Sequence, residues 1–377
     1  MMKQIIFLAC AAFLSAHICF AAELSVCPEG CAYDMIQDAI DSASAGDTVL
    51  VGDGTYDEDV YMNKSITLRS VNGSASTIIP EGLYTENSLY IQANGSKLIG
   101  FTVADGVVLD QVNNIVVAEN NLSGGNFTEA ISVEYSHDSL IYLNIISKRE
   151  DNGIYIISSS NIRIYENNIS KNLGSGVMLS YNCTNNFLYG NIMSDNSEGL
   201  SLSSSTSGNN ISMNVLTGNT YGIYLRGNGN IVTQNTVTGN KDYGVFLAGT
   251  SNGSLIRGNT ICDNADSDIY NDSAYTNAGD NNMCGAAGGW KDAGAVSGCV
   301  YSCSSVSTTT STPTTSSSTP TTSSTTTTQG QCSLPGDYPP CGPISLDEIV
   351  NHINKWAADR AALEEVINLI LEWARQK

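Results

Sequence analysis

A tandem repeat of 22 to 24 residues occupies the middle of the chain, from Gly106 to Tyr270. Most units open with Gly followed by an apolar residue, as in Gly153-Ile-Tyr-Ile and Gly176-Val-Met-Leu. A repeat of this length indicates a solenoid, in which each unit forms one turn that stacks on its neighbours. Apolar residues alternate within a unit, so each turn is predicted to consist of short strands rather than helices.

The predicted fold is all-β: a right-handed, single-stranded parallel β-helix with 22–24 residues per turn and polar corners between its strands. Parallel strands stack about 4.8 Å apart, so eight repeat units predict a stack of roughly 40 Å. Asparagine recurs at one position of every unit, where it tolerates left-handed backbone and its amide can form hydrogen bonds along the axis. These asparagines are predicted to be structural: Asn120, Asn144, Asn167, Asn191, Asn214, Asn235 and Asn259.

Residues 1–22 have the features of a secretory signal peptide, with Lys3 before an apolar run and small residues at the predicted cleavage site. No other run of eighteen apolar residues occurs, so no transmembrane anchor is expected after the signal is removed. The mature chain is expected to be secreted or exposed on a cell surface. A net charge of −21 argues against nucleic acid as a partner. Ten Asn-x-Ser/Thr sequons offer acceptors for N-linked glycans: Asn63, Asn72, Asn94, Asn121, Asn126, Asn168, Asn182, Asn210, Asn252 and Asn271.

The cysteines of the exported chain cluster near the ends of the predicted modules. In an oxidising compartment this distribution favours local disulfides, and the clusters lack the His and Cys-x-x-Cys spacing of zinc sites, the alternative interpretation. Cys27–Cys31 and Cys332–Cys341 are the expected pairs. The group Cys262, Cys284, Cys299 and Cys303 allows three connectivities, and Cys183 is expected to be a lone or buried thiol.

Composition divides the rest of the chain into further segments. Residues 23–80 are predicted to form an N-terminal cap with an amphipathic helix and the first turns, and residues 81–303 the β-helix repeats and a Cys-rich end. Residues 304–330 consist almost entirely of Thr, Ser and Pro, which predicts a disordered, O-glycosylated stalk. Residues 331–377 contain two amphipathic helical patterns, which predict a small two-helix module.

Several of these motifs resemble those of known families. Ile36-Gln-x-Ala-Ile, Ala45-Gly-Asp-Thr-Val and Lys64-Ser-Ile-Thr-Leu resemble the N-terminal cap of pectin-lyase-like β-helix proteins. The repeats resemble those of the NosD-like group and of archaeal surface β-helix proteins. This resemblance implies the fold but not the function, because the fold hosts many functions. The helix pair that follows Gly336-Asp337 resembles a dockerin-like module, although its loops lack the calcium-binding pattern.

Aligning the units predicts outward rows in which chemistry could reside. Asp110 and Glu134 are expected on adjacent turns, and paired carboxylates can divide acid and base roles. His137 and Arg149 follow nearby, and a lyase needs a proton acceptor and a cation that neutralises a uronate. The motifs typical of β-helix polygalacturonases, pectate lyases and alginate epimerases are absent from the sequence. These four residues are therefore the candidate catalytic group for a polysaccharide lyase, epimerase or glycoside hydrolase, and a plain solvated surface is the alternative.

Other residues are candidates for binding rather than catalysis. Tyr155, Tyr224 and Phe246 fall in one outward row, where aromatic rings can stack on sugars. Asp263, Asp266, Asp268 and Asp272 are dense enough in sequence for a calcium site, and calcium is the one cofactor expected. The NosD resemblance implies a copper-handling role, but Met178, Met193 and Met213 on successive turns do not fall in one row and are interpreted as packing or surface residues.

The leading interpretation is a non-catalytic, secreted or cell-surface β-helix scaffold. It would bind a polysaccharide or other glycan surface, and residues 331–377 would attach it to a protein partner in an envelope or complex. The enzyme and the metal-handling protein are the two alternatives.

Overall fold

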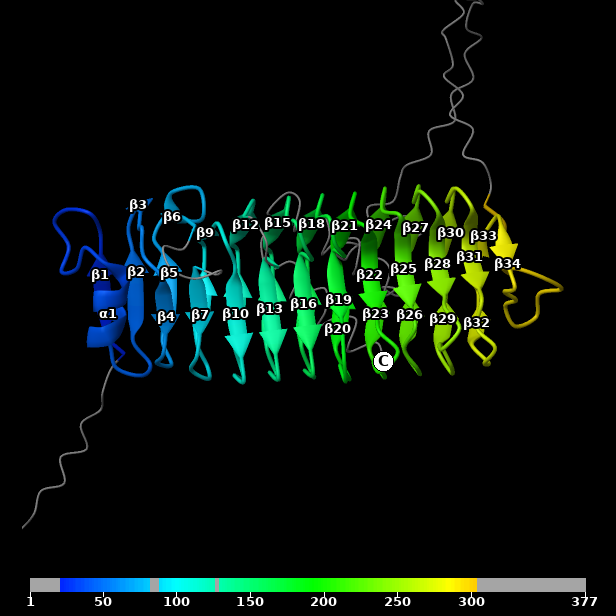
Figure 1. Cartoon of the computed structure of the whole chain (residues 1–377), viewed down its shortest axis with the longest axis horizontal. Helices are drawn as coiled ribbons and strands as arrows, with labels where there is room; N and C mark the ends of the chain where they lie inside the picture. Colours follow the sequence, from blue (N-terminus) through cyan, green and yellow to red (C-terminus); the bar gives the residue numbers. More distant parts are fainter. Residues whose placement is uncertain (1–20, 82–87, 126–128, 304–377) are drawn as a thin grey trace, which may run out of the picture. The chain divides into compact units, whose positions relative to one another are not determined.

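The computed structural model describes residues 21–81, 88–125 and 129–303, which form a parallel β-solenoid. Figure 1 shows its strands as successive turns that run from helix α1 at one end to strand β34 at the other. Three sheets line the solenoid, and each turn contributes one strand to each sheet. The predicted signal peptide up to residue 20, the stalk at 304–330 and the module at 331–377 lie outside the described residues.

Sheet A contains the first strand of every turn. Its twelve strands, in spatial order, are β1 (Glu23–Val26), β2 (Thr48–Val51), β5 (Thr67–Ser70), β8 (Lys97–Ile99), β11 (Val116–Ala118), β14 (Leu140–Tyr142), β17 (Arg163–Tyr165), β20 (Phe187–Tyr189), β23 (Asn210–Ser212), β26 (Ile231–Thr233), β29 (Leu255–Arg257) and β32 (Ala278–Asp280).

Sheet B contains the second strand of every turn. Its eleven strands are β3 (Gly54–Thr55), β6 (Thr77–Ile79), β9 (Thr102–Val103), β12 (Asn121–Ser123), β15 (Ile145–Ser147), β18 (Asn168–Ser170), β21 (Ile192–Ser194), β24 (Val215–Thr217), β27 (Thr236–Thr238), β30 (Thr260–Cys262) and β33 (Met283–Cys284).

Sheet C contains the third strand of every turn. Its eleven strands are β4 (Val60–Met62), β7 (Leu89–Ile91), β10 (Val107–Asp110), β13 (Ile131–Glu134), β16 (Ile154–Ile157), β19 (Val177–Leu179), β22 (Glu198–Leu202), β25 (Tyr221–Leu225), β28 (Tyr243–Leu247), β31 (Ser267–Asn271) and β34 (Ala287–Gly288). The described residues thus form about eleven turns, more than the eight repeat units, because the first turns lack the repeat motif.

Alternation along each strand places one set of side chains in a continuous core. In one turn Ile156 of β16, Ile164 of β17 and Ile169 of β18 are all fully buried. Burying each of these side chains contributes about 1.5–3 kcal/mol. The strands are parallel and pair without slippage, for example Ile131 with Ile154 and Ile154 with Val177. Like residues therefore stack on like residues, and the predicted alternation and fold class are confirmed.

The N-terminal end of the core is covered by helix α1 (Ile36–Ser42), as predicted. Ile36, Ala39 and Ile40 face the core, whereas Met35 precedes the helix and is exposed. The Glu58 carboxylate accepts hydrogen bonds from the backbone nitrogens of Ile36 and Gln37, at 2.7 and 2.9 Å. These are donors that the first helical turn leaves without an intrahelical partner, so Glu58 from the first turn of the solenoid caps the helix.

The repeated asparagines form hydrogen-bonded ladders along the corners. In the A–B ladder, each Oδ1 accepts hydrogen bonds from the backbone nitrogen and Nδ2 of the asparagine one turn earlier, as Asn167 does for Asn144, at 3.0 and 2.9 Å. The side-chain nitrogen also reaches backbone carbonyls, so these buried amides are almost fully satisfied. The predicted structural role is confirmed for the members of this ladder: Asn120, Asn144, Asn167, Asn191, Asn214, Asn235 and Asn259, followed by Asn282.

Two further ladders follow the other corners. The B–C ladder joins Asn172, Asn196, Asn219, Asn240 and Asn264. The C–A ladder joins Asn186, Asn209 and Asn230. The repeat pattern does not predict this ladder. Each of the first two ladders ends on a carboxylate. Asn282 donates to Asp292 and Asn264 donates to Asp268, so the last donors of each ladder meet a charged acceptor.

The C-terminal end of the solenoid is closed by a segment that packs back on its last turns. Trp290 is buried there, and two disulfides, Cys262–Cys303 and Cys284–Cys299, fix the segment. The structure thereby selects one of the three connectivities and contains the predicted Cys27–Cys31 bridge. Cys183 is free and buried, and burial raises the pKa of its thiol. The predicted Cys332–Cys341 pair lies outside the described residues.

Candidate functional site

Five aromatic side chains gather on the outer face of sheet C near its C-terminal end, and we call them the aromatic surface. It consists of Tyr221 and Tyr224 on β25, Tyr243 and Phe246 on β28, and Tyr270 on β31. The parallel register places Tyr224, Phe246 and Tyr270 in one row and Tyr221 and Tyr243 in a second. All five rings are partly exposed, whereas the alternate residues Ile223, Val245 and Ile269 point into the core.

A glycine fixes the spacing between the two rows. Gly222 and Gly244 separate the first ring of each strand from the core residue that follows. A methyl group on Gly222 would overlap the carbonyl oxygen of Gly244 on the next turn, and other side chains at this corner would do the same. Only glycine lets the two turns approach this closely. The repeated Gly therefore positions the rings as well as the solenoid corner.

The rings of the aromatic surface pack on one another in parallel pairs. Tyr224 and Phe246 stack with ring centroids 5.3 Å apart, and Phe246 and Tyr270 with centroids 5.6 Å apart. Tyr221 and Tyr243 stack at 5.6 Å in the second row, and Tyr243 lies 5.1 Å from Phe246 across the rows. Mutual packing restricts the rings, so little rotamer freedom remains to be lost when a ligand stacks on them.

The border of the aromatic surface is mostly acidic. Burial and then Asp242 raise the pKa of Tyr221, and burial followed by Asp266 raises that of Tyr243. Glu198 pairs in register with Tyr221 and contributes to the same field. Arg226 provides a cation, with its guanidinium carbon 4.6 Å from the Tyr224 ring centroid and a hydrogen bond of 3.2 Å to the Tyr224 hydroxyl.

This arrangement suits a flat ligand that has both apolar faces and hydroxyl groups. The ring edges and tyrosine hydroxyls remain partly exposed, and the carboxylates around them accept hydrogen bonds from hydroxyls. The negative field disfavours a polyanion and favours a neutral one. Pyranose rings have these properties, because their axial C–H groups form an apolar face and their hydroxyls radiate from the edge.

The structure brings together two of the three predicted sugar-binding residues. Tyr224 and Phe246 stack as expected, whereas Tyr155 lies on the same row between Ser132 and Met178, three turns from the aromatic surface. Tyr221, Tyr243 and Tyr270 were not predicted. A signal was present, because Tyr221-Gly-Ile-Tyr and Tyr243-Gly-Val-Phe repeat the same pattern in successive units.

The candidate catalytic residues are placed apart. Asp110 and Glu134 pair in register on β10 and β13, as the alignment predicted, and Glu134 accepts a hydrogen bond of 3.0 Å from Ser132. His137 lies on the corner beyond β13, where its Nδ1 is 2.9 Å from the Ser160 hydroxyl. Within the described part of the chain no hydrogen bond or ion pair joins His137 to either carboxylate. The two carboxylate residues are thus on adjacent turns, and His137 bonds to Ser160 instead of to either of them.

Arg149 is a correction to the predicted group, because it is inside the solenoid. It is 1% exposed and occupies the first position of the B–C ladder, where its backbone nitrogen donates to Asn172. Its side chain donates to the backbone carbonyls of Leu122 and Asp105. Burial lowers the pKa of the guanidinium to about 10. A residue in this position caps the ladder and cannot contact a polymer on the outer surface.

The four aspartates of the predicted calcium site do not converge. Asp263, Asp266 and Asp272 are exposed, while Asp268 is buried and accepts backbone hydrogen bonds from Asn264, Gly285 and Ala286. Among the described residues no group of three or more His, Cys, Asp or Glu side chains is arranged to hold a metal ion. Asp268 ends the B–C ladder and binds the closing segment, which accounts for its carboxylate without calcium.

The three methionines considered for copper point in different directions. Met178 is on the outer face of sheet C, Met193 is fully buried in the core, and Met213 is exposed at the A–B corner. Soft metals require convergent sulfur ligands, and these side chains do not converge.

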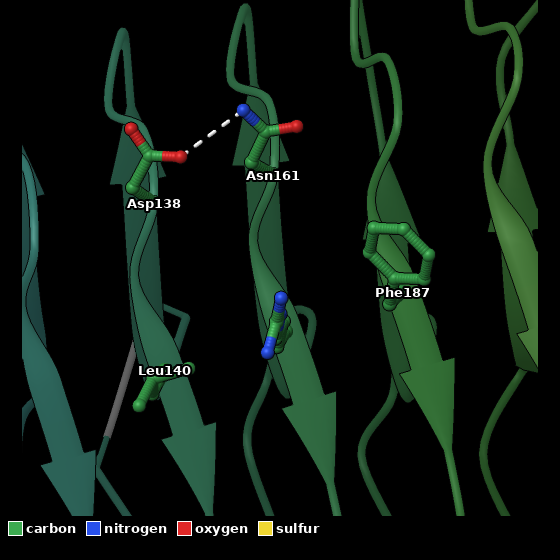
Figure 2. Close-up of a pocket in the computed structure, with 5 residues that line it drawn as sticks. Asp138, Leu140, Asn161 and Phe187 are labelled. Atoms are coloured by element: carbon green, nitrogen blue, oxygen red, sulfur yellow. Dashed lines mark hydrogen bonds between the residues drawn. The ribbon is translucent and has the colours of Figure 1, made fainter.

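Sheet A carries a separate hollow of about 460 Å³, drawn in Figure 2. Asp138 and Asn161 lie side by side at its upper end, joined by a hydrogen bond of 3.0 Å, with Leu140 and Phe187 further along the strands. Arg163 completes the lining, and its guanidinium carbon is 6.0 Å from the Phe187 ring centroid. The hollow is open and shallow, and it is separate from the aromatic surface on sheet C.

Comparison with known proteins places the chain within this architecture. The family described as "Right handed beta helix region" matches residues 81–231, and the family described as "Periplasmic copper-binding protein (NosD)" matches residues 181–289. These matches support a right-handed β-helix of the pectin-lyase-like kind. The fold expected from the repeats and the cap motifs is therefore confirmed.

Two solved structures share the fold of this β-helix protein. The A-module of the mannuronan C-5 epimerase AlgE6 of Azotobacter vinelandii is 16% identical, with 71% of this chain and 92% of that chain covered, at a TM-score of 0.50. The Dettilon tailspike protein is 14% identical, with 66% and 58% covered, at a TM-score of 0.53. At these identities the likeness concerns the fold alone.

One relative is a protein of the cell surface. A cell surface glycoprotein of Methanothermus fervidus is 33% identical over 107 residues, which are 27% of this chain and 18% of that protein. The chain thus matches about a fifth of its relative's length. Among the described residues no helix is long and apolar enough to span a membrane. An extracellular or surface location fits these relatives.

Proposed function

We propose that this β-helix protein acts at the cell surface by binding a neutral polysaccharide across the aromatic surface of sheet C. The observation that carries the proposal is the pair of stacked rows, with Tyr224, Phe246 and Tyr270 in one row and Tyr221 and Tyr243 in the other. Rings on consecutive turns give a polymer several apolar contact points along the solenoid axis, so weak contacts add over its length.

The positions of the sequons support the choice of this face. Nine of the ten lie in the described residues, and only Asn271, at the end of β31, belongs to a strand of sheet C. Asn63, Asn94, Asn182 and Asn252 lie at the corners between sheets C and A. Glycans on these residues would leave most of the outer face of sheet C open to a ligand.

Binding to a panel of soluble polysaccharides tests the proposal. Neutral glucans, mannans and galactans are compared with alginate and polygalacturonate by isothermal titration calorimetry. A neutral polymer is expected to bind most tightly, and Phe246→Ala or Tyr243→Ala to weaken it about tenfold, or about 1.4 kcal/mol. Tyr155→Ala is the matched control, because it removes an isolated ring from the same row. Equal affinity in all three variants would place the ligand elsewhere, and preference for a uronan would refute the neutral class.

Catalysis at the Asp110–Glu134 pair is the alternative, favoured by the register of the two carboxylates. The same panel tests it, because a lyase releases unsaturated products that absorb near 235 nm and a hydrolase releases reducing ends. Product that disappears in Glu134→Gln would establish an enzyme. We do not extend the copper named in the NosD family to this chain, because Met178, Met193 and Met213 diverge.

We further propose that residues 304–377 attach the protein to its envelope or complex, as the composition of the stalk and the dockerin-like helical pattern indicate. These residues lie outside the described structure, so the proposal depends on their sequence. A chain that ends at residue 330 is expected to be released into the medium, whereas the full chain stays with the cell fraction. Equal retention of the two chains would remove the role of the helical module in attachment.

A further inference from the structure

The outer face of sheet A has its own column of aromatic rings, which the function proposed above does not use. Tyr142, Tyr165 and Tyr189 stack on consecutive turns, with ring centroids 4.8 and 4.9 Å apart. In the parallel column Leu140, Arg163 and Phe187 follow one another in register and line the hollow of Figure 2. Phe187 remains 40% exposed, although the Arg163 guanidinium lies over its ring.

The next strand on this face contains a sequon. Asn210-Ile211-Ser212 forms all of β23, and the register pairs Asn210 with Phe187 and Ser212 with Tyr189. Strand alternation turns Ile211 into the core, where it is fully buried, so Asn210 and Ser212 both lie on the outer face. On its other side Asn210 pairs with Ile231, which is 38% exposed. The sequon therefore lies between two apolar side chains that remain open to solvent.

The Asn210 side chain lacks the ladder hydrogen bonds that hold the corner asparagines of the solenoid. Its neighbour Asn209 belongs to the C–A ladder and bonds to Asn230 and Cys183. By contrast, Asn210 Oδ1 is buried without a hydrogen-bond partner in the described residues, and no described acceptor binds Nδ2. In the unmodified chain this amide contributes no hydrogen bond to stability, and burial of its oxygen without a partner costs free energy.

We propose that Asn210 is N-glycosylated and that the first sugars of its glycan lie on Phe187 and Tyr189. Asn210 Nδ2 forms the bond to the anomeric carbon of an oligosaccharide donated by a lipid-linked oligosaccharide phosphate. The bond from that carbon to the phosphate oxygen breaks, the lipid phosphate leaves with the electron pair, and Nδ2 loses one proton. The glycan then covers Phe187 and extends along the column toward Arg163 and the hollow at Asp138 and Asn161.

Sugar stacking explains why the aromatic column and the sequon adjoin. The attached sugar is held one turn, about 4.8 Å, from the Phe187 backbone, which is close enough for its C–H face to meet the ring. Because the glycan is tethered, stacking costs little additional translational entropy. Asn168 offers a matched comparison: it has the same strand position on sheet B, but its register neighbours are Ile145 and Ile192 and no ring adjoins it.

Mass spectrometry of the full chain, purified from the cells that produce it, tests the modification. Trypsin cleaves after Lys171 and Arg226 and releases a peptide that contains Asn182 and Asn210, so fragmentation must assign the sugar to one of them. A glycan mass on Asn210 is expected, and its loss in Ser212→Ala, which keeps Asn210 but destroys the sequon. An unmodified Asn210 would overturn the proposal.

A thermodynamic cycle tests the packing. Phe187→Ala is expected to lower the Tm of the glycosylated chain by about 2–4 °C more than that of the Ser212→Ala chain, because only the former loses sugar stacking. Phe187→Leu keeps an apolar side chain without a ring and is the control for an effect of Phe187→Ala on folding itself. The control pair is Phe187→Ala with Asn168→Gln, for which additive effects are expected. Additive effects of Phe187→Ala and Ser212→Ala would show that the glycan does not lie on the ring.

Discussion

Arg149 departs from the repeat motif but still occupies the first position of the B–C ladder. The residue at this point of the unit is Asn172 or a later asparagine in the following turns, and Gly125 one turn earlier. The Arg149 guanidinium passes into the space that Gly125 leaves open, because a methyl group on Gly125 would overlap it. There it donates to the carbonyls of Leu122 and Asp105, while Nη2 has no hydrogen-bond partner among the described residues. Glycine and arginine together thus replace two turns of the ladder.

We expect Arg149→Ala to lower the free energy of unfolding by about 2–4 kcal/mol, because it leaves a cavity and removes the guanidinium hydrogen bonds to two backbone carbonyls. Gly125→Ala is expected to be destabilising as well, since its φ of 88° is left-handed and the new methyl group displaces Arg149. Urea unfolding of both single variants and the double variant measures their coupling. The double variant should cost less than the sum, and strict additivity would contradict the proposed contact.

At the scale of the element, the asparagine ladder is the feature that sets the corners. Asn191 accepts two hydrogen bonds from Asn167, donates to the carbonyls of Ile164 and Tyr189, and bonds to Asn214. Asn191→Ala removes all of these at once and leaves buried groups unpaired, so we expect a loss of about 2–4 kcal/mol in thermal or urea unfolding. Asn228→Ala, at an exposed corner, is the control and should cost less than about 0.5 kcal/mol. Similar losses of unfolding free energy in both variants would contradict a stabilising role of the ladder.

The elements also show what a sequence can and cannot predict. The outward row that contains Ser132, Tyr155 and Met178 follows from the repeat alone, because parallel turns of nearly constant length fix the register. The ends of the ladders do not follow from it. Asp268 and Asp292 occur once each, and only the folded closing segment brings Asp292 to Asn282. The sequence therefore predicts Asp268 as one of four calcium ligands, whereas its carboxylate accepts hydrogen bonds from Asn264 and from the backbone nitrogens of Gly285 and Ala286.

For the whole molecule, a solenoid needs ends that its repeats cannot supply. Each turn contacts only its neighbours, so a turn without a neighbour exposes apolar core and an unpaired strand edge. Helix α1 and the Cys27–Cys31 bridge close the first end. The buried Trp290, Asp292 and two disulfides close the other. The aromatic surface reaches Tyr270 on β31, so closure of this end also keeps the proposed binding face in place.

This dependence makes a prediction about where the protein unfolds first. The disulfides Cys262–Cys303 and Cys284–Cys299 close loops with sequence separations of 41 and 15, each worth about 3–4 kcal/mol in the chain-entropy account. In Cys284→Ser/Cys299→Ser, hydrogen exchange is expected to accelerate in residues 255–303, with little change at 140–220, because turns communicate only through neighbours. Cys27→Ser/Cys31→Ser is the control at the opposite end, where the bridge spans a separation of four and should matter little. Uniform loss of protection along the chain would instead mean that the solenoid unfolds as one cooperative unit.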